Sequence, residues 1–282
     1  MQTLDDYINE IKTLPPAPRV LSQLLVLLDD VDSHASQIVE LIAFDPALTA
    51  KVLQRCNNAA FALGRPICDL DEAVTLVGFN AIYRLVAMVV GEGLLSAEQP
   101  GYGIGTGQLW EHSVTTALAA RVIARKLDGA ENLAFTAALL HDIGKLVLGA
   151  FLEGCERSVL QETGPSGRSF LEAEKAILGV NHAEIGGRVL AQWNFPENLV
   201  SAVWHHHDPA RATPHEQLAA YVHLGDIIAH CLGQAQGHQS FALRAQAGAL
   251  HILEISPKEI DTLVLETDAA LQQCPGITRL TS

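Results

Sequence analysis

Helical periodicity runs through almost the whole chain, and it restricts the possible folds more than any other feature. In residues 16–30, "PAPRVLSQLLVLLDD", apolar side chains recur three and four positions apart, as on one face of a helix. In "DPALTAKVLQRCNNAAF", Asp45 is a capping residue and Pro46 fits the first helical turn. Alternating apolar and polar segments bounded by turn pairs, which would indicate strands, are missing. The sequence therefore predicts an all-α protein.

Three later segments carry the start signal of a helix. Ser169, Thr213 and Ser256 are each followed three positions later by a glutamate. This is the capping-box pattern, in which two side chains satisfy backbone N–H groups at a helix start. We expect a helix to begin at each of these positions.

The most polar and glycine-rich break is "SAEQPGYGIGTGQ", Ser96–Gln108. We interpret it as the boundary between a helical N-terminal half, residues 1–98, and a second half, residues 106–282. A long internal loop would have the same composition. Of the 12 histidines, only His34 precedes this break. Histidine chemistry is therefore expected in the second half.

Composition and charge narrow the classes of ligand. The 282 residues are 49% hydrophobic and carry a formal net charge of -14 at pH 7. Binding to a nucleic-acid polymer through a general basic surface is not expected, because neutralising phosphates requires clustered Lys and Arg. A small anionic ligand stays possible, because bound metal ions can supply local positive charge.

Cysteine usage and apolar runs indicate a cytoplasmic protein. The cysteines are scattered singly, without a CxxC pair, which favours reduced thiols; they are Cys56, Cys68, Cys155, Cys231 and Cys274. The acidic start "MQTLDDYINEIKTLPP" lacks the layout of a signal peptide. The apolar run "IYRLVAMVVGEGLL" contains Arg84 and Glu92, so we expect no membrane span.

The stretch "AALLHDIGKLVLG", residues 137–149, places His141, Asp142 and Lys145 in an apolar run that we expect to be helical. Polar groups in such a run need partners or a function. Neighbouring helical residues point about 100° apart, so His141 and Asp142 could share one ion only across the helix flank. One imidazole and one carboxylate suit a borderline or hard divalent metal.

Four further places in the second half could add ligands. His112 lies in the first turns of an amphipathic helix, and His182 follows the expected capping residue Asn181. Residues 205–207 are three histidines at the expected end of a helix. The helix dipole favours a histidine there, but three in a row exceed what the dipole requires. Asp226 lies in an apolar helix without a nearby Lys or Arg, which would be costly if it stayed unpaired. Each has an ordinary structural explanation, but together they suit a one- or two-metal site inside a helical bundle.

The other histidines have no such pattern. We expect ordinary surface or capping roles for His34, His215, His230, His238 and His251. His223 lies one helical turn before Asp226. It could orient that carboxylate, although simple packing is the more common role.

The order His112, His141-Asp142, Asp226, together with "HDIGK", resembles the HD superfamily of metal-dependent phosphohydrolases. "HAEIGGRVL" from His182 and the "HHH" of residues 205–207 resemble ligand segments of its HD-GYP subgroup, whose members cleave cyclic di-GMP. The Gly-Tyr-Pro motif of that subgroup is absent, because the chain continues "DPARATP".

This resemblance implies a set of ligands. One ion would be held by His112, His141, Asp142 and Asp226, and a second by His182, His206 and His207 with Asp142 as the bridge. His205 is the spare, and the choice between His205 and His207 stays open. Lys145 would lie near a substrate phosphate, so Asp142 and Lys145 are the catalytic candidates. The ions would be iron, manganese, zinc or nickel, one or two per chain.

A second resemblance covers more of the chain. "LPPAPRV" from Leu14, "DPALTAKVLQRCNNAAF" from Asp45 and "ICDLDEAVTLVGFNAIYRLV" from Ile67 resemble the N-terminal half of HDOD proteins, and so does the Asn-x-Ala segment at 57–59. The resemblance implies a helical N-terminal half packed on an HD-type bundle. It also implies a regulatory role in bacterial signalling, in a family whose members have mostly lost parts of the metal site.

Three functions follow as alternatives. The first is a signalling module whose metal site is structural or senses a ligand, and which acts on signalling partner proteins. The second is an active phosphohydrolase or phosphodiesterase for a nucleotide or cyclic dinucleotide. The third is a helical interaction protein whose histidines bind no metal. None of the three needs a membrane or a nucleic-acid polymer as partner.

Overall fold

The computed structural model describes Tyr7, Asn9, Leu14, Gly237 and residues 19–30, 33–57, 67–163, 168–234 and 246–273. These residues form α-helices and two short 3-10 helices, without any strand beyond an isolated bridge between Gln99 and Ile104. The predicted all-α class is confirmed. Cys274, His238, residues 15–18 of the "LPPAPRV" segment and residues 58–59 of the Asn-x-Ala segment lie outside the described residues.

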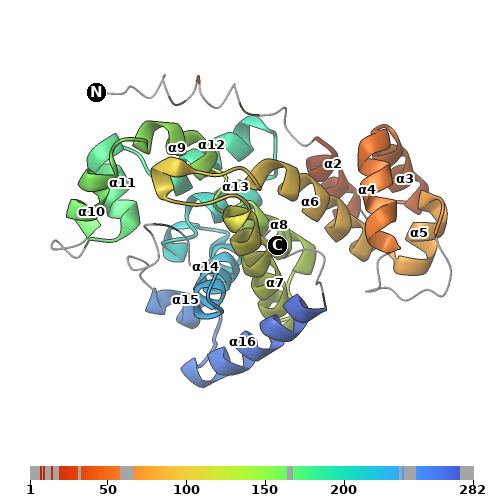
Figure 1. Cartoon of the computed structure of the whole chain (residues 1–282). Coiled ribbons are helices and arrows are strands. Elements are labelled where there is room, and N and C mark those ends of the chain that lie inside the picture. The colour runs from red at the N-terminus through yellow and green to blue at the C-terminus, as the bar shows by residue number, and fades with distance from the viewer. Residues whose placement is uncertain are drawn as a thin grey trace.

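The N-terminal helices form one group (Figure 1). They are α2 (Arg19–Asp29), α3 (Ala35–Ala43), α4 (Pro46–Cys56), α5 (Leu70–Val77) and α6 (Phe79–Leu95). Asp45 caps α4 as expected, because its carboxylate accepts the N–H groups of Ala47 and Leu48. The long helix α6 leaves this group and packs on α7 and α8 of the second half.

The second half has a central group of helices surrounded by shorter ones (Figure 1). Helices α7 (Gln108–Lys126), α8 (Glu131–Leu139) and α14 (Glu216–Cys231) pack on one another at the centre. The remaining elements are η1 (Pro100–Tyr102), α9 (Lys145–Leu152), α10 (Glu156–Thr163), α11 (Phe170–Leu178), α12 (His182–Gln192), α13 (Glu197–Trp204), η2 (Pro209–Arg211), α15 (Ala247–Ile252) and α16 (Pro257–Gln272).

The glycine-rich break is an ordered part of the second half. Gly101, Tyr102 and Ile104 are buried, and η1 packs on α9 so closely that a Cβ on Gly101 would lie 2.2 Å from the carbonyl oxygen of Gly149. In addition, the Tyr102 hydroxyl of this segment donates a hydrogen bond to Glu174. The division at residues 98 and 106 stays a prediction, and the two parts share contacts.

Tyr7, the first described residue, contacts helices of the second half. Tyr7 is 1% exposed, and its hydroxyl donates to the carbonyl oxygen of Leu178 at 2.9 Å. Its ring meets Phe151 edge to face, with 4.8 Å between the centroids. Tyr7 therefore packs against α9 and the end of α11.

Two of the three predicted capping boxes are confirmed. Ser169 and Ser256 each form one, at the starts of α11 and α16. The prediction at Thr213 is wrong, because α14 begins only at Glu216, with His215 as the N-cap residue. The Thr213 hydroxyl donates to the Glu216 side chain at 2.6 Å.

The expectation that His141 and Asp142 lie within a helix is also wrong. Helix α8 ends at Leu139 and α9 begins at Lys145, so both residues lie in the turn 140–144 between them. Gly144 lets this turn approach α12 closely, because a Cβ there would lie 2.0 Å from the carbonyl oxygen of His182. The turn and the start of α12 touch backbone to backbone, and this contact brings the residue pair next to His182.

No single described helix is long and apolar enough to cross a membrane, and the pair α5 and α6 reaches the required length and apolarity only across a bend of 119°. The described cysteines, Cys56, Cys68, Cys155 and Cys231, are free thiols. This agrees with the expected reduced state.

The contact at Gly144 generates a prediction about stability. Gly144→Ala should lower the free energy of unfolding by about 1–3 kcal/mol or more, because the added methyl group overlaps a backbone carbonyl that cannot rotate away. The matched control is Gly93→Ala in α6, where a Cβ meets nothing within 4 Å. That change should raise the free energy of unfolding by about 0.5–1 kcal/mol, since alanine favours helix over glycine. Urea unfolding followed by circular dichroism measures both, and equal midpoints for wild type and Gly144→Ala would contradict the packing argument.

Candidate metal centre

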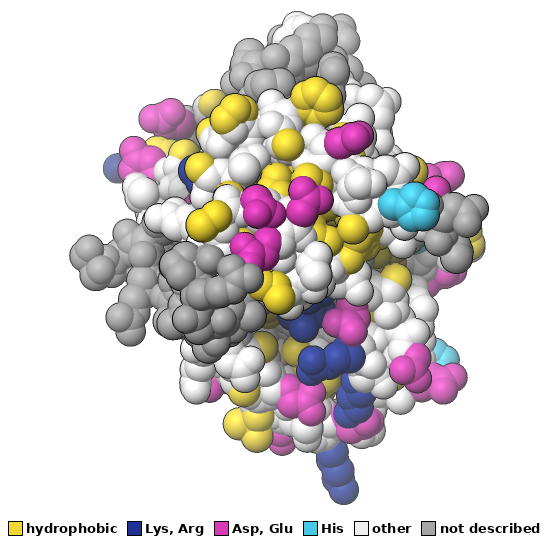
Figure 2. Space-filling model, turned by 90° about the vertical axis from the view of Figure 1, so that its right-hand side faces the viewer, with side chains coloured by type: hydrophobic (Ala, Val, Ile, Leu, Met, Phe, Trp, Pro, Cys, Tyr) yellow, Lys and Arg dark blue, Asp and Glu magenta, His cyan; other side chains and the backbone are white. Residues whose placement is uncertain are grey.

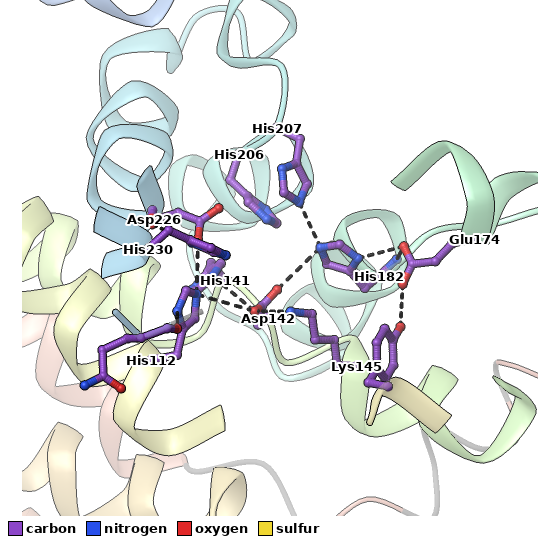
Figure 3. Close-up of polar contacts among 12 residues, drawn as sticks. His112, His141, Asp142, Lys145, Glu174, His182, His206, His207, Asp226 and His230 are labelled. Atoms are coloured by element: carbon purple, nitrogen blue, oxygen red, sulfur yellow. Dashed lines mark hydrogen bonds and ion pairs between the residues drawn. The ribbon is translucent and has the colours of Figure 1, made fainter. Parts of the chain in front are cut away.

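The structure brings the expected ligand residues of the second half together (Figure 3). They come from α7, the turn 140–144, the start of α12, the segment after α13, and α14. Almost all are fully buried: His112 1%, His141 1%, Asp142 2%, His182 0%, His206 0% and Asp226 2% exposed, with His207 half-buried. Lys145 is 1% exposed and borders the same cluster.

Asp142 lies at the centre of the cluster. Its Oδ2 atom is 3.2 Å from His141 Nε2 and 2.5 Å from Lys145 Nζ, and its Oδ1 atom is 3.4 Å from His182 Nε2. Burial would raise the pKa of Asp142, but His141 and Lys145 hold that pKa well below its usual range. The side chain is therefore a carboxylate with partners on both of its oxygens.

Asp226 is the second buried carboxylate. Its Oδ1 atom lies 3.1 Å from His112 Nε2 and 3.2 Å from His230 Nδ1. Burial would raise the pKa of Asp226, but hydrogen bonds from His112 and His230 hold it well below its usual range. Asp226 has no Lys or Arg close to it in the sequence, and two imidazole rings are its partners instead.

Three of the histidines share one geometry. In each of them Nδ1 lies within hydrogen-bond distance of a backbone carbonyl at or just beyond a helix C-terminus: His112 with Gln234 (2.9 Å), His141 with Ala138 (2.7 Å) and His206 with Val203 (2.7 Å). Carbonyls at helix C-termini lack partners within the helix. Because a carbonyl can only accept, Nδ1 carries a proton, and in a neutral ring the lone pair available to a metal is then on Nε2. Metal-binding histidines typically have this arrangement.

His182 is held by a carboxylate that the sequence analysis missed. Glu174 is 0% exposed, and its Oε2 atom lies 2.7 Å from His182 Nδ1 and accepts the His182 backbone N–H at 3.0 Å. Its Oε1 atom accepts the hydroxyl of Tyr102 at 2.5 Å. Glu174 lies four residues from both Phe170 and Leu178 on the buried face of α11. A charged residue in an apolar stripe was the signal available in the sequence.

His206 and His207 complete the side of the cluster next to His182. His207 Nε2 lies 2.9 Å from His182 Nε2, and His206 Nε2 is buried without a hydrogen-bond partner among the described residues. Burial and neighbouring imidazoles hold the pKa values of both well below the usual range, so both rings are neutral. His205 is not in this group; its ring faces Trp204, with 6.3 Å between the centroids.

His223 does not bond to the Asp226 carboxylate. Its Nδ1 lies 2.8 Å from the carbonyl oxygen of His206, and its Nε2 accepts the backbone N–H of Gln246 at 2.9 Å. Nδ1 donates to a carbonyl and Nε2 accepts an N–H group, so both ring nitrogens of His223 have hydrogen-bond partners. His223 therefore fixes the backbone that carries His206.

The expectation of an ordinary surface or capping role for His230 is wrong. Its Nδ1 lies 2.9 Å from the carbonyl oxygen of Asp226 and 3.2 Å from the carboxylate of the same residue. The missed signal was the spacing, because residues four apart on a helix share one face. A histidine four positions after a buried aspartate is a candidate partner for it.

The donor atoms of the cluster fit divalent metal ions. Three sets of described side chains each bring ligand atoms within 4.8 Å of one another: His112, His141 and Asp142; His112, Asp226 and His230; and His182, His206 and His207. The unpartnered Nε2 of His206 is a lone pair that burial leaves unsatisfied unless a ligand meets it. Mixed imidazole and carboxylate donors suit borderline divalent ions such as iron, manganese, nickel and zinc.

A comparison with protein families agrees with the geometry. The family model described as the HDOD domain matches residues 14–209, which is most of the chain. The chain belongs to the HDOD family. The matched range covers the N-terminal helices and the candidate metal ligands as far as His207.

Solved structures of two bacterial proteins have the same fold as this chain. A candidate phosphohydrolase from Shewanella amazonensis aligns with a TM-score of 0.72 and 22% identity over 97% of both chains. A candidate signal transduction protein from Marinobacter aquaeolei aligns with a TM-score of 0.73 and 21% identity, over 98% of this chain and 65% of that one. An uncharacterized protein from Treponema pallidum is 27% identical over 212 residues. That stretch is 71% of this chain and spans only 39% of the relative.

The contact between Glu174 and His182 generates a prediction. Glu174→Gln removes the charge that fixes the His182 ring, and it should weaken divalent-metal binding about 10- to 100-fold, the usual cost of losing such a support. Glu172→Gln on the same helix is the control, because Glu172 is exposed and glutamine preserves the capping box with Ser169. Titration against a fluorescent chelator measures both affinities. Unchanged binding in Glu174→Gln would show that the carboxylate does not support the centre.

Proposed function

We propose that this HDOD chain is a regulatory signalling module that holds two divalent metal ions in the core of its second half. One observation carries the proposal. Buried histidines anchored through Nδ1 bring the Nε2 atoms of His141 and His182 next to the ionised Asp142. The ring of His206 neighbours both, and its buried Nε2 has no partner among the described residues.

Two groups of side chains would hold the ions. The first ion would be held by His112, His141, Asp142 and Asp226 and the second by His182, His206 and His207, with Asp142 shared between the two sets. Iron, manganese, zinc and nickel all accept this donor set. When bound, the ions would supply the positive charge that a phosphate-bearing ligand needs in a protein with a net charge of -14.

Burial supports a regulatory role over rapid turnover. The ligands at the centre are 0–2% exposed, except for the half-buried His207. Catalysis also needs an open metal position and room for a substrate. A buried centre suits an ion or a ligand that sets the conformation read by signalling partner proteins. The fold shared with a candidate signal transduction protein is in line with this role.

A second function, hydrolysis of a nucleotide or cyclic dinucleotide, is favoured by one observation. Lys145 lies beside the centre with its Nζ 2.5 Å from Asp142 Oδ2, where a cation could also meet a phosphate. Asp142 and Lys145 are the residues that such a reaction would require. The fold shared with a candidate phosphohydrolase is in line with this alternative.

The proposal predicts the metal content. Protein purified without chelators or a histidine tag should contain about two equivalents of divalent metal per chain by elemental analysis. The double variant His141→Ala/Asp142→Ala should contain well under one, because it removes the bridge and a ligand of the first ion. Wild-type protein that stays metal-free after reconstitution with iron, manganese, zinc and nickel would refute the proposal.

A panel of phosphoesters separates the two functions. Metal-loaded protein should bind cyclic dinucleotides or nucleotides without hydrolysing them, and its conformation should change on metal binding. Metal-dependent release of phosphate or of linear dinucleotide, lost in Lys145→Ala, would favour the phosphohydrolase.

The two ions should respond differently to acid. Burial lowers the pKa of His141, but the Asp142 carboxylate outweighs it, so the net pKa lies above the usual 6.5. The pKa values of His206 and His207 lie well below 6.5. Protons therefore compete with metal at His141 first as the pH falls. Dialysis from pH 7.5 down to 5.5 should release the ion on His141 before the ion on His206 and His207, and simultaneous loss of both would contradict this order.

A further inference from the structure

We propose that His230 is an additional protein ligand of the first ion and that it binds through Nε2. This inference rests on the proposed function, because it needs the ion on His112 and Asp226 to be present. His230 is outside the ligand set implied by the sequence, and its assignment comes from its contacts in α14.

The position of His230 fits a ligand. It follows Asp226 by one helical turn, and its ring centroid lies 5.0 Å from that of His112. The three residues each offer one ligand atom, which for a histidine is either ring nitrogen, and these atoms lie within 4.8 Å of one another. Figure 3 shows His230 beside Asp226, on the side of the cluster formed by His112. His112 therefore links this set to the set that contains His141 and Asp142.

The hydrogen bonds of His230 define its tautomer. Nδ1 lies 2.9 Å from the Asp226 carbonyl oxygen and 3.2 Å from its carboxylate oxygen. Both oxygens are acceptors, so Nδ1 carries a proton. In the neutral ring, the free lone pair is then on Nε2.

That Nε2 atom is buried and has no hydrogen-bond partner among the described residues. Leaving a polar atom in this state is costly, so such atoms usually meet a partner or a ligand. His206 is the one other described histidine with a buried, unpartnered Nε2. His223 provides the contrast, because its Nε2 accepts a backbone N–H and is satisfied without a metal.

A fifth ligand changes what the first ion can do. His112, His141, Asp142 and Asp226 supply four donors, and His230 would supply another. An ion with about six positions would then keep roughly one for an external ligand. Such an ion is held tightly and leaves little room for a substrate and an attacking water together, which favours sensing over hydrolysis.

Cobalt(II) binding to the full chain tests the assignment. His230→Asn keeps a donor at about the place of Nδ1 and removes Nε2, so the contact to Asp226 is preserved while the proposed ligand is lost. His230→Gln instead places an amide oxygen near the position of Nε2. His251→Asn, at an exposed histidine of α15, is the control.

We expect His230→Asn to weaken the binding of one of the two cobalt ions at least about tenfold. Its visible absorption should change, and X-ray absorption should count one imidazole fewer per chain. His230→Gln should recover part of the affinity, and His251→Asn should match wild type. Circular dichroism of the metal-free variants checks that they are folded.

Two outcomes overturn the assignment. His230→Asn could bind both ions with wild-type affinity and an unchanged spectrum, which would leave His230 as a partner of Asp226 alone. Equal losses in the Asn and Gln variants would also overturn it, because they would reflect the loss of the ring and not of the Nε2 donor. Wild-type protein that binds no cobalt would be a distinct result, since it removes the proposed function itself.

Discussion

The contacts of the buried Asp142 carboxylate hold the candidate metal centre of the second half together. A negative charge in a protein core is tolerated only with partners, and here His141, His182 and Lys145 surround it. Carbonyl groups at the ends of α8, α13 and α14 in turn hold the Nδ1 atoms of three histidines, so helix ends and metal ligands satisfy one another. The same side chains that stabilise the charge are therefore the ones that can bind a metal.

The segment between α6 and α7 connects this centre to the rest of the chain. Tyr102 in η1 donates to Glu174, and Glu174 bonds to both the backbone and the ring of His182. Two hydrogen-bonded side chains thus connect the candidate metal centre to the start of the second half. The helix α6, which precedes this segment, also contacts α8 directly, because the Tyr83 hydroxyl lies 2.5 Å from the Thr136 hydroxyl. These contacts provide a physical route by which the centre could influence the N-terminal helices.

The sequence predicts this structure where the signal is local. Helical periodicity is sufficient for the all-α class, and capping residues such as Asp45 and Ser169 mark true helix starts. The sequence does not predict contacts between residues that lie far apart along the chain. The turn 140–144 packs through Gly144 on the backbone of His182, and the buried Glu174 accepts a hydrogen bond from Tyr102, which lies 72 residues earlier in the chain. His230 lies between these cases, because its spacing from Asp226 is visible in the sequence but its burial is not.

The central claim is that Asp142 bridges two divalent ions, and anomalous X-ray diffraction from crystals of metal-loaded protein tests it most directly. We predict two anomalous peaks, one on each side of the Asp142 carboxylate, the first next to His112, His141 and Asp226 and the second next to His182, His206 and His207. No peak in this cluster, at metal concentrations that saturate the protein, would contradict the account and leave the histidines as a hydrogen-bonded core.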